Sequence, residues 1–250
     1  SEKNHNPLCM LSKKMKLNFI EHKKYIGGRY SVLTEVGMVP AYLMGLNITS
    51  FRKNLMNHFS IKNKNFLKDS STKLTNLIEN KKFKNIVFLN YAPELDKFLF
   101  WLQQLIAESL GKRGKGFFPT ISKAPKDHHS LMQLYLDGPK DKLFYIFSKK
   151  KKSNGKKLNS KIFEKKFDFI NNKSLQKIKT NQMIAFKTIL AKKKIPFREF
   201  EIKNFSEQTL SELFSFFSLE TAIVGKLSKI NPFDQPAVEQ VKSITKKLLS

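Results

Sequence analysis

The sequence contains a single cysteine, Cys9, among its 250 residues, so no disulfide can form within the chain. A lack of disulfides is normal in a reducing compartment, and we therefore expect a cytoplasmic protein. Long apolar runs are also missing, since no uninterrupted apolar stretch is long enough to cross a bilayer. The first residues, Ser1 to Asn6, are polar and lack the apolar core of a secretion signal. We expect neither a membrane partner nor a signal peptide.

Arginine and acidic residues are scarce, and the formal net charge is +27. Such a charge suggests a nucleic-acid partner, because cationic patches displace counterions from phosphates. However, only four of the 47 basic residues are arginine, whereas proteins that read nucleic acids usually rely on arginine forks. The densest run, Lys149 to Lys152, is followed by Ser-Asn-Gly and is typical of a solvated loop. The sequence therefore favours a charged surface over a specific nucleic-acid site.

Short apolar strands alternate with longer helical patterns, which indicates a layered α/β domain. Hydrophobic residues make up 40% of the chain, enough for a sizeable core. Strands are expected at 85–90, 117–121, 142–148 and 197–202. Helices are expected from Pro93 to Gly111, from Asp127 to Leu136, from Ser174 to Lys194, after Asn204, and from about Gln235.

Capping signals mark several of these helices. Gly111 is predicted to end its helix in the left-handed conformation, and Asp127 to cap the start of the next. Asn204 and Glu207 have the spacing of a capping box. The helix that follows carries an apolar stripe, predicted to be core, at Leu210, Leu213, Phe214, Phe217 and Val224.

The remaining segments are less regular. Residues 14–22 predict a short strand, and Val32 to Leu46 predicts a closely packed helix. Residues 51–80 are polar and predict helix. Residues 149–173 predict a mobile insertion.

The run Gly27-Gly28-Arg29 is the first candidate for chemistry. Two glycines permit a tight turn and let backbone N–H groups approach a ligand. The arginine stays charged, so it can hold a phosphate or stabilise a developing oxyanion. An ordinary turn with a surface arginine explains the same residues.

Gln104 and Glu108 are four residues apart and therefore share a helix face. A carboxylate in the last turn of a helix faces the negative end of the helix dipole, which disfavours its ionised form. Burial would add to this effect and make Glu108 a better general base. A solvated glutamate is the alternative.

His128 and His129 lie at a predicted helix start, where the dipole favours a neutral imidazole that can accept a proton. Both could equally serve as hydrogen-bonding caps.

Gln235 and Lys242 are seven residues apart, about two helical turns, and share a face. A partly desolvated lysine can donate a proton, although spacing alone carries little weight in a chain this rich in lysine.

Four long segments, in this order, resemble phosphoglucose isomerase, the enzyme that interconverts glucose 6-phosphate and fructose 6-phosphate. They are residues 26–37, with Ile-Gly-Gly-Arg-Tyr-Ser; residues 101–112, with Ala-Glu-Ser-Leu-Gly-Lys; residues 129–142; and residues 225–242, with Asn-Pro-Phe-Asp-Gln-Pro. The resemblance is to the bacterial type and covers nearly the whole chain.

The resemblance implies an aldose–ketose isomerase with a sugar-phosphate substrate and without cofactor or metal. In the family, a glutamate moves a proton between C2 and C1 through a cis-enediol, and that position matches Glu108. An arginine that stabilises the enediolate matches Arg29. The histidine and lysine that help open the sugar ring match His129 and Lys242. Residues that contact the substrate match Gly28, Gln104 and Gln235.

The implied fold is a layered α/β/α sugar-isomerase (SIS-type) sandwich with a parallel-type sheet, plus a C-terminal helical arm. Residues 1–80 would form an inter-domain segment, 81–228 the second sugar-isomerase domain and 229–250 the arm that reaches the active site. The family is a homodimer in which the histidine enters the active site from the partner subunit, and we expect the same here.

One departure concerns the phosphate of the substrate. The family holds it with a Ser/Thr-rich loop upstream of the Gly-Gly-Arg segment, whereas the 26 residues before Gly27 contain no such loop and Ser70-Ser71-Thr72 lies downstream. The sequence is therefore expected to be the C-terminal part of a longer enzyme. Two alternatives stay open: a non-catalytic sugar-phosphate-binding remnant and a basic nucleic-acid-binding module.

Overall fold

The computed structural model describes residues 6–150, 155–159 and 165–250. The chain divides into two compact units. Unit 1 comprises Ser1–Glu79, Gln104–Gly116 and Ser206–Ser250, and unit 2 comprises Asn80–Gln103 and Phe117–Phe205. The predicted division into domains at 1–80, 81–228 and 229–250 stays a prediction.

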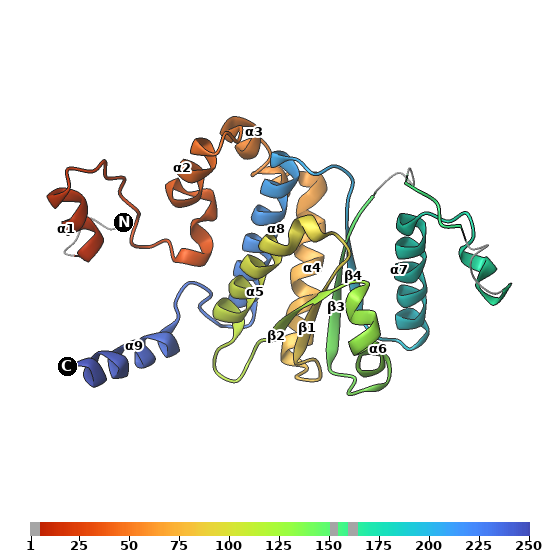
Figure 1. Cartoon of the computed structure of the whole chain (residues 1–250). Coiled ribbons are helices and arrows are strands. Elements are labelled where there is room, and N and C mark those ends of the chain that lie inside the picture. Colours follow the sequence, from red (N-terminus) through yellow and green to blue (C-terminus); the bar gives the residue numbers. More distant parts are fainter. Residues whose placement is uncertain (1–5, 151–154, 160–164) are drawn as a thin grey trace. The chain divides into compact units, whose positions relative to one another are not determined.

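A sheet of four parallel strands in the order β2-β1-β3-β4 forms the centre of unit 2 (Figure 1). The central strand β1 is bonded on both sides, with Asn85 opposite Phe118 of β2 and Lys142 of β3. The bounds are β1 Asn85–Asn90, β2 Phe118–Lys123, β3 Lys142–Lys149 and β4 Phe197–Ile202. All four predicted strands are therefore confirmed, and so is the α/β class.

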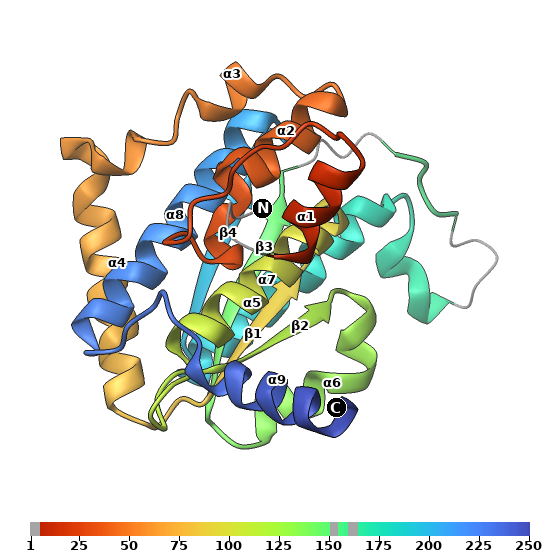
Figure 2. The same ribbon diagram turned by 90° about the vertical axis from the view of Figure 1, so that its left-hand side faces the viewer.

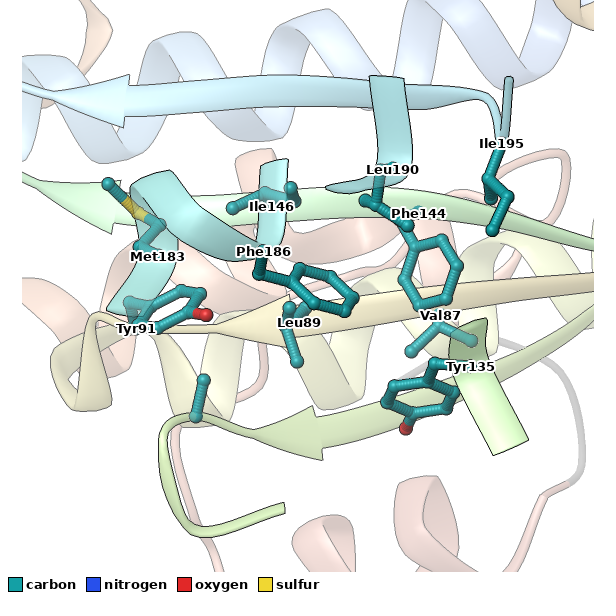
Figure 3. Close-up of a cluster of buried hydrophobic side chains, with 11 residues drawn as sticks. Val87, Leu89, Tyr91, Tyr135, Phe144, Ile146, Met183, Phe186, Leu190 and Ile195 are labelled. Atoms are coloured by element: carbon teal, nitrogen blue, oxygen red, sulfur yellow. The ribbon is translucent and has the colours of Figure 1, made fainter. Parts of the chain in front are cut away.

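Two helices of unit 2 cover one face of this sheet. They are α6 Lys126–Asp137 and α7 Leu175–Lys192. The unit also contains η3 Pro93–Leu95, η5 Lys165–Ile170 and the first part of α5 Asp96–Leu110, which continues into unit 1. Figure 3 shows Met183, Phe186 and Leu190 of α7 gathered with buried side chains of β1 and β3. Tyr135 of α6 joins the same cluster and meets Phe144 edge to face.

The opposite face of the sheet packs against the first half of α5. Phe98 lies 6.4 Å, ring centre to ring centre, from Phe147 of β3, which also stacks on Phe200 of β4 at 4.9 Å. Strands buried on both faces explain why β1 and β3 read as continuous apolar runs instead of alternating ones. Unit 2 is thus a three-layered α/β/α sandwich.

Unit 1 is helical in its described part. Its helices are α1 Pro7–Lys14, η1 Gly28–Leu33, α2 Glu35–Leu43, α3 Ile48–Arg52, η2 Asn57–Phe59, α4 Ile61–Glu79, the end of α5, α8 Glu207–Leu227 and α9 Pro236–Leu249. Figure 2 shows α4 and α8 side by side. Phe214, Phe217 and Val224 of α8 are buried, which confirms most of the predicted stripe, whereas Leu210 and Leu213 are half-buried.

Some local predictions were wrong. Residues 15–22, all of which the structure describes, contain no strand, because no neighbouring strand pairs with them. Gly111 does not adopt the left-handed conformation, which occurs instead at Arg113, Gly114 and Gly116. A side chain at Gly111 would bring its Cβ to 2.5 Å from the Ala107 carbonyl oxygen, so close approach, and not handedness, favours glycine there.

Two predicted N-caps were also wrong. Asp127 lies inside α6, and its carboxylate accepts from Ser122 Oγ and Lys123 N, which end β2. Helix α8 is capped by Ser206, which accepts from Thr209 N, instead of by Asn204. The predicted insertion at 149–173 lies partly outside the described residues. Its described part contains η5 and Lys157, which forms an isolated bridge with Ser174 just beyond the insertion.

Candidate active site

Arg29, in the first turn of η1, is a buried side chain that donates five hydrogen bonds, with only 2% of its surface exposed. Its Nε donates to Ser109 Oγ (2.8 Å) at the end of α5. Its Nη1 donates to Gln235 Oε1 (2.7 Å) and Glu108 Oε2 (3.2 Å). Its Nη2 donates to the carbonyl oxygens of Pro232 (2.6 Å) and Asp234 (2.9 Å). These contacts use all five donors of a guanidinium.

Glu108 lies in the last turn of α5, with 30% of its side chain exposed. One carboxylate oxygen faces the Arg29 guanidinium, and the other accepts from Gln104 Nε2 (3.0 Å), one helical turn earlier. The predicted pairing of Gln104 and Glu108 on one face is confirmed. Because the guanidinium is adjacent, a full positive charge opposes the effect of the helix dipole on Glu108.

The Glu108 carboxylate lines a cavity of about 470 Å³ in unit 1. The end of α5 forms one wall, and the turn before α9 together with the first residues of that helix forms the other. The lining residues are Ala107, Glu108, Gly111, Lys112, Arg113, Ile230, Asn231, Asp234, Gln235, Pro236, Ala237 and Val238. A cavity of this size is within the usual range of small-molecule sites.

Two titratable groups next to this cavity have displaced pKa values. Burial raises the pKa of the Tyr30 hydroxyl above its usual 10.0, although Ser109 and Arg29 act in the opposite direction. A hydrogen bond from Lys112 holds the pKa of the Asp234 carboxyl below its usual 3.8. Asp234 is therefore ionised at neutral pH, and Tyr30 is a neutral donor or acceptor.

The structure brings together four of the predicted site residues, Arg29, Gln104, Glu108 and Gln235. Gly28, also predicted, directly precedes Arg29 at the start of η1, and a Cβ at Gly28 would meet nothing within 4 Å. Backbone at this position is thus open to a ligand.

The other two predicted residues lie elsewhere in the chain. Lys242 is exposed on α9, where it forms an ion pair with Glu239 (2.7 Å). His129 is exposed on α6, in unit 2. Its neighbour His128 is half-buried, and Tyr91 Oη lies 2.5 Å from its Nε2. Burial lowers the pKa of His128 below its usual 6.5, which favours the neutral imidazole expected at this helix start, although the cause is desolvation and not the predicted helix dipole.

Residue-level reasoning overlooked three residues that belong to the site: Ser109, Lys112 and Asp234. Ser109 is fully buried and bonds both Arg29 and the Tyr30 hydroxyl (3.1 Å). Lys112 and Asp234 form an ion pair of 2.7 Å. The four-residue spacing from Glu108 to Lys112 was the available signal, since it repeats the spacing from Gln104 to Glu108.

Within the described ranges, no group of three or more His, Cys, Asp or Glu side chains is arranged to hold a metal ion. Likewise, none of the helices in those ranges combines the length and the apolar character that crossing a membrane requires.

A family model and individual relatives of known name match this chain, and they all point to the same family. The model of the family described as "Phosphoglucose isomerase" matches residues 15–250. Glucose-6-phosphate isomerase of Mycoplasmopsis pulmonis is 35% identical over 90% of this chain and 54% of its own length. The same enzyme of Methanocaldococcus jannaschii is 32% identical over 90% of this chain and 56% of its own length. The chain thus spans little more than half the length of these relatives.

Solved structures support the same fold. A hypothetical protein from Thermus thermophilus superimposes with a TM-score of 0.85 at 24% identity, over 100% of this chain and 61% of that one. A glucose-6-phosphate isomerase from Chlamydia trachomatis gives 0.72 at 17% identity, over 92% of this chain and 48% of that one. The family match over nearly the whole sequence is independent of these likenesses, and it shows that the chain belongs to the phosphoglucose isomerase family.

Proposed function

We propose that this chain carries the acid–base centre of a glucose-6-phosphate isomerase, which interconverts glucose 6-phosphate and fructose 6-phosphate in glycolysis and gluconeogenesis. The observation that carries the proposal is the position of Glu108. Glu108 lines a cavity of about 470 Å³. Its carboxylate accepts hydrogen bonds from the Arg29 guanidinium on one side and from the Gln104 amide on the other. A fixed carboxylate in a cavity is what proton transfer at carbon requires.

In the proposed reaction, Glu108 takes the proton from C2 of the open-chain aldose and returns it to C1 through a cis-enediol. One carboxylate can serve both carbons because they are adjacent. Negative charge develops on the substrate oxygens in between, and a fixed cation nearby offsets it. The chemistry needs only protons to move, so we propose no cofactor and no metal.

Arg29 is the proposed cation for the enediolate. All five of its donors are bonded to protein acceptors, two of which are Glu108 and Gln235. Its positive charge would therefore stabilise the enediolate electrostatically, without a direct hydrogen bond to the substrate unless one of these bonds is broken. The bond to Glu108, at 3.2 Å, is the longest of the five and is the one that a substrate oxygen would most easily replace. Gln104, Gln235 and the open backbone at Gly28 are the proposed contacts to sugar hydroxyls.

His129 and Lys242 are the proposed residues for opening the sugar ring, as they are in the family. Both are exposed, so they are available to a ligand or to a second subunit. We propose a cytoplasmic homodimer in which His129 serves the active site of the partner subunit. In this arrangement, the Glu108 and His129 that serve one active site belong to different subunits.

A second candidate function is sugar-phosphate binding without turnover. The observation that favours it is length: the chain covers 54% and 56% of two isomerase relatives. The 26 residues that precede Gly27 in this sequence include no Ser/Thr-rich run of the kind that the resemblance predicts for phosphate binding. The expectation that such a loop lies upstream stays a prediction.

The test is isomerisation of fructose 6-phosphate by the purified 250-residue chain, coupled to glucose-6-phosphate dehydrogenase. Glu108→Gln keeps the shape and the amide contact of the side chain but removes the base. We expect kcat to fall by about 10²–10⁴-fold, the usual contribution of a general base. Glu79→Gln is the matched control, because Glu79 forms an ion pair with Lys115 and is not part of the cavity lining.

The outcomes separate the candidates. Turnover that disappears in Glu108→Gln and persists in Glu79→Gln supports the isomerase. Equal turnover in wild type and Glu108→Gln would remove Glu108 from the mechanism. If the wild-type chain binds fructose 6-phosphate in calorimetry but does not isomerise it, the binding function replaces the isomerase for this chain. Salt-dependent binding to DNA beyond that of a polylysine control would instead support the nucleic-acid alternative.

A further inference from the structure

Lys112 lies two residues beyond the end of α5, and its ammonium group reaches the turn that precedes α9. Its Nζ donates to the carbonyl oxygen of Asn231, to the carbonyl oxygen of Asp234 (2.6 Å) and to Asp234 Oδ1 (2.7 Å). Only 13% of the side chain is exposed. An ammonium has three donors, and these three acceptors use all of them.

Arg29 also binds this turn, through its Nη2 nitrogen. Its Nη2 donates to the carbonyl oxygens of Pro232 and Asp234, so the Asp234 carbonyl accepts from both cations. The turn itself is closed by Asn231, whose side chain donates to Asp234 Oδ2 (3.0 Å) and accepts from Phe233 N (3.1 Å). Two positive side chains thus donate to three carbonyl oxygens of this turn, those of Asn231, Pro232 and Asp234.

This clamped turn ends at Gln235, a lining residue of the cavity opposite Glu108. Gln235 Oε1 accepts from Arg29 Nη1, the same nitrogen that donates to Glu108. Any movement of the turn therefore moves Gln235 and changes the bonds of Arg29 at the same time. Charge-assisted bonds such as those of Lys112 are about twice as strong as neutral ones, which suits them to hold such a turn.

We propose that Lys112 is a positioning residue of the isomerase site, which fixes the turn at 231–235 so that Gln235 and Arg29 keep their places beside Glu108. The proposal rests on the proposed function. Lys112 also lines the cavity, so direct contact with a substrate phosphate is the competing role. Its three filled donors oppose that role, because a phosphate could bind only by displacing the turn.

Lys112→Met tests the proposal, since methionine keeps most of the apolar stem and removes the ammonium. We expect kcat to fall by about 10²-fold, the cost of a misplacement of about 1 Å, with a smaller change in KM. Lys112→Arg should restore part of the loss because it can still donate to carbonyl oxygens. The control is Lys115→Met: Lys115, from the same loop, bonds Glu79 and the Ser228 carbonyl and does not line the cavity.

Hydrogen–deuterium exchange gives a readout that does not depend on turnover. In Lys112→Met, the amides of residues 233–238 other than Pro236 should exchange at least about tenfold faster than in wild type and in Lys115→Met, because the clamp that limits local opening is gone. A double-mutant cycle with Gln235→Ala tests whether Lys112 acts through Gln235. If Lys112 acts through Gln235, the two losses in kcat will not add.

Several results would overturn the positioning role. One is a Lys112→Met variant with wild-type kcat and a raised KM, which would indicate direct phosphate binding. Another is additive losses in the cycle with Gln235→Ala. If the wild-type chain shows no turnover, the proposed function fails on its own, and unchanged exchange at 233–238 in Lys112→Met would separately refute the clamp.

Discussion

The five hydrogen bonds of Arg29 join two segments: Glu108 and Ser109 at the end of α5, and the turn at 231–235. A lysine would keep the charge but concentrate its three donors at one point, so it could not bridge these partners. This explains why an arginine stands here in a chain with 47 basic residues, of which only four are arginine. In a chain this rich in lysine, an arginine therefore marks a candidate site better than a lysine does.

The lowered pKa of His128 in unit 2 predicts a specific pH dependence for the stability of the protein. Desolvation lowers the pKa of His128 below its usual 6.5, and the Asp127 carboxylate opposes this only in part. A group whose pKa is lower in the folded state stabilises the fold above its unfolded pKa. That stabilisation is lost as the pH falls from 6.5 through the folded pKa, because the unfolded chain then binds more protons.

We therefore expect the free energy of unfolding to decrease between pH 7.5 and pH 5.5, and to decrease less in His128→Gln. Glutamine can still bond the Tyr91 hydroxyl but does not titrate. Urea denaturation at the two pH values measures the difference, and His129→Gln, at the exposed neighbouring position, is the control. A pH dependence that is the same in His128→Gln and wild type would show that His128 does not contribute.

At the scale of elements, helix α8 and the turn before α9 depend on one glycine. A Cβ at Gly225 would lie 2.9 Å from Cβ of Pro232, the residue whose carbonyl accepts from Arg29. Pro232 is buried, so it has little room to move away. The close approach of helix and turn thus requires a residue without a side chain.

Gly225→Ala should destabilise unit 1, although the same change in an ordinary helix stabilises it by about 0.5–1 kcal/mol. We expect a loss of about 1–3 kcal/mol in the free energy of unfolding, the usual cost of overpacking a tight contact. Urea denaturation measures it, with Lys226→Ala, exposed on the same helix, as the control. A stabilised Gly225→Ala variant would mean that the turn can shift at no cost.

The success of prediction from the sequence also varied by element. The bounds of β1 and β4 matched the expected 85–90 and 197–202 because an apolar or alternating run defines each strand locally. Residues 14–22 have a similar local pattern but no strand partner, and they form none. The Asp127 cap failed because its carboxylate is engaged by the end of β2. Caps and isolated strands depend on partners that the local sequence does not contain.

At the scale of the whole molecule, the candidate site could be predicted only in part. Periodicity placed Gln104 and Glu108 on one face, and the family resemblance supplied Arg29 and Gln235. The contacts that join them span 79 and 206 residues of sequence, which no local pattern reports. Lys112 was hidden for another reason: lysine is so common in this chain that its spacing from Glu108 had no weight until the structure showed its acceptors.

The proposed sharing of active sites between subunits predicts complementation between two inactive variants. Glu108 belongs to unit 1 and His129 to unit 2, and in a two-fold symmetric dimer each site would use Glu108 of one subunit and His129 of the other. A mixed dimer of Glu108→Gln and His129→Asn chains then has one intact site and one site that carries both changes. Random pairing of equal amounts makes half of the dimers mixed, so the mixture should regain about a quarter of wild-type turnover.

The measurement is the coupled isomerisation assay on the two variants, co-expressed or refolded together, beside each variant alone and at equal total concentration. The gain should disappear when the variants are refolded separately and then combined without exchange of subunits. A mixture as inactive as its components, made from chains that separately prove dimeric, would place His129 in the site of its own subunit or outside catalysis. Activity retained by His129→Asn alone would exclude the histidine from ring opening, because a general acid–base group normally contributes about 10²-fold or more.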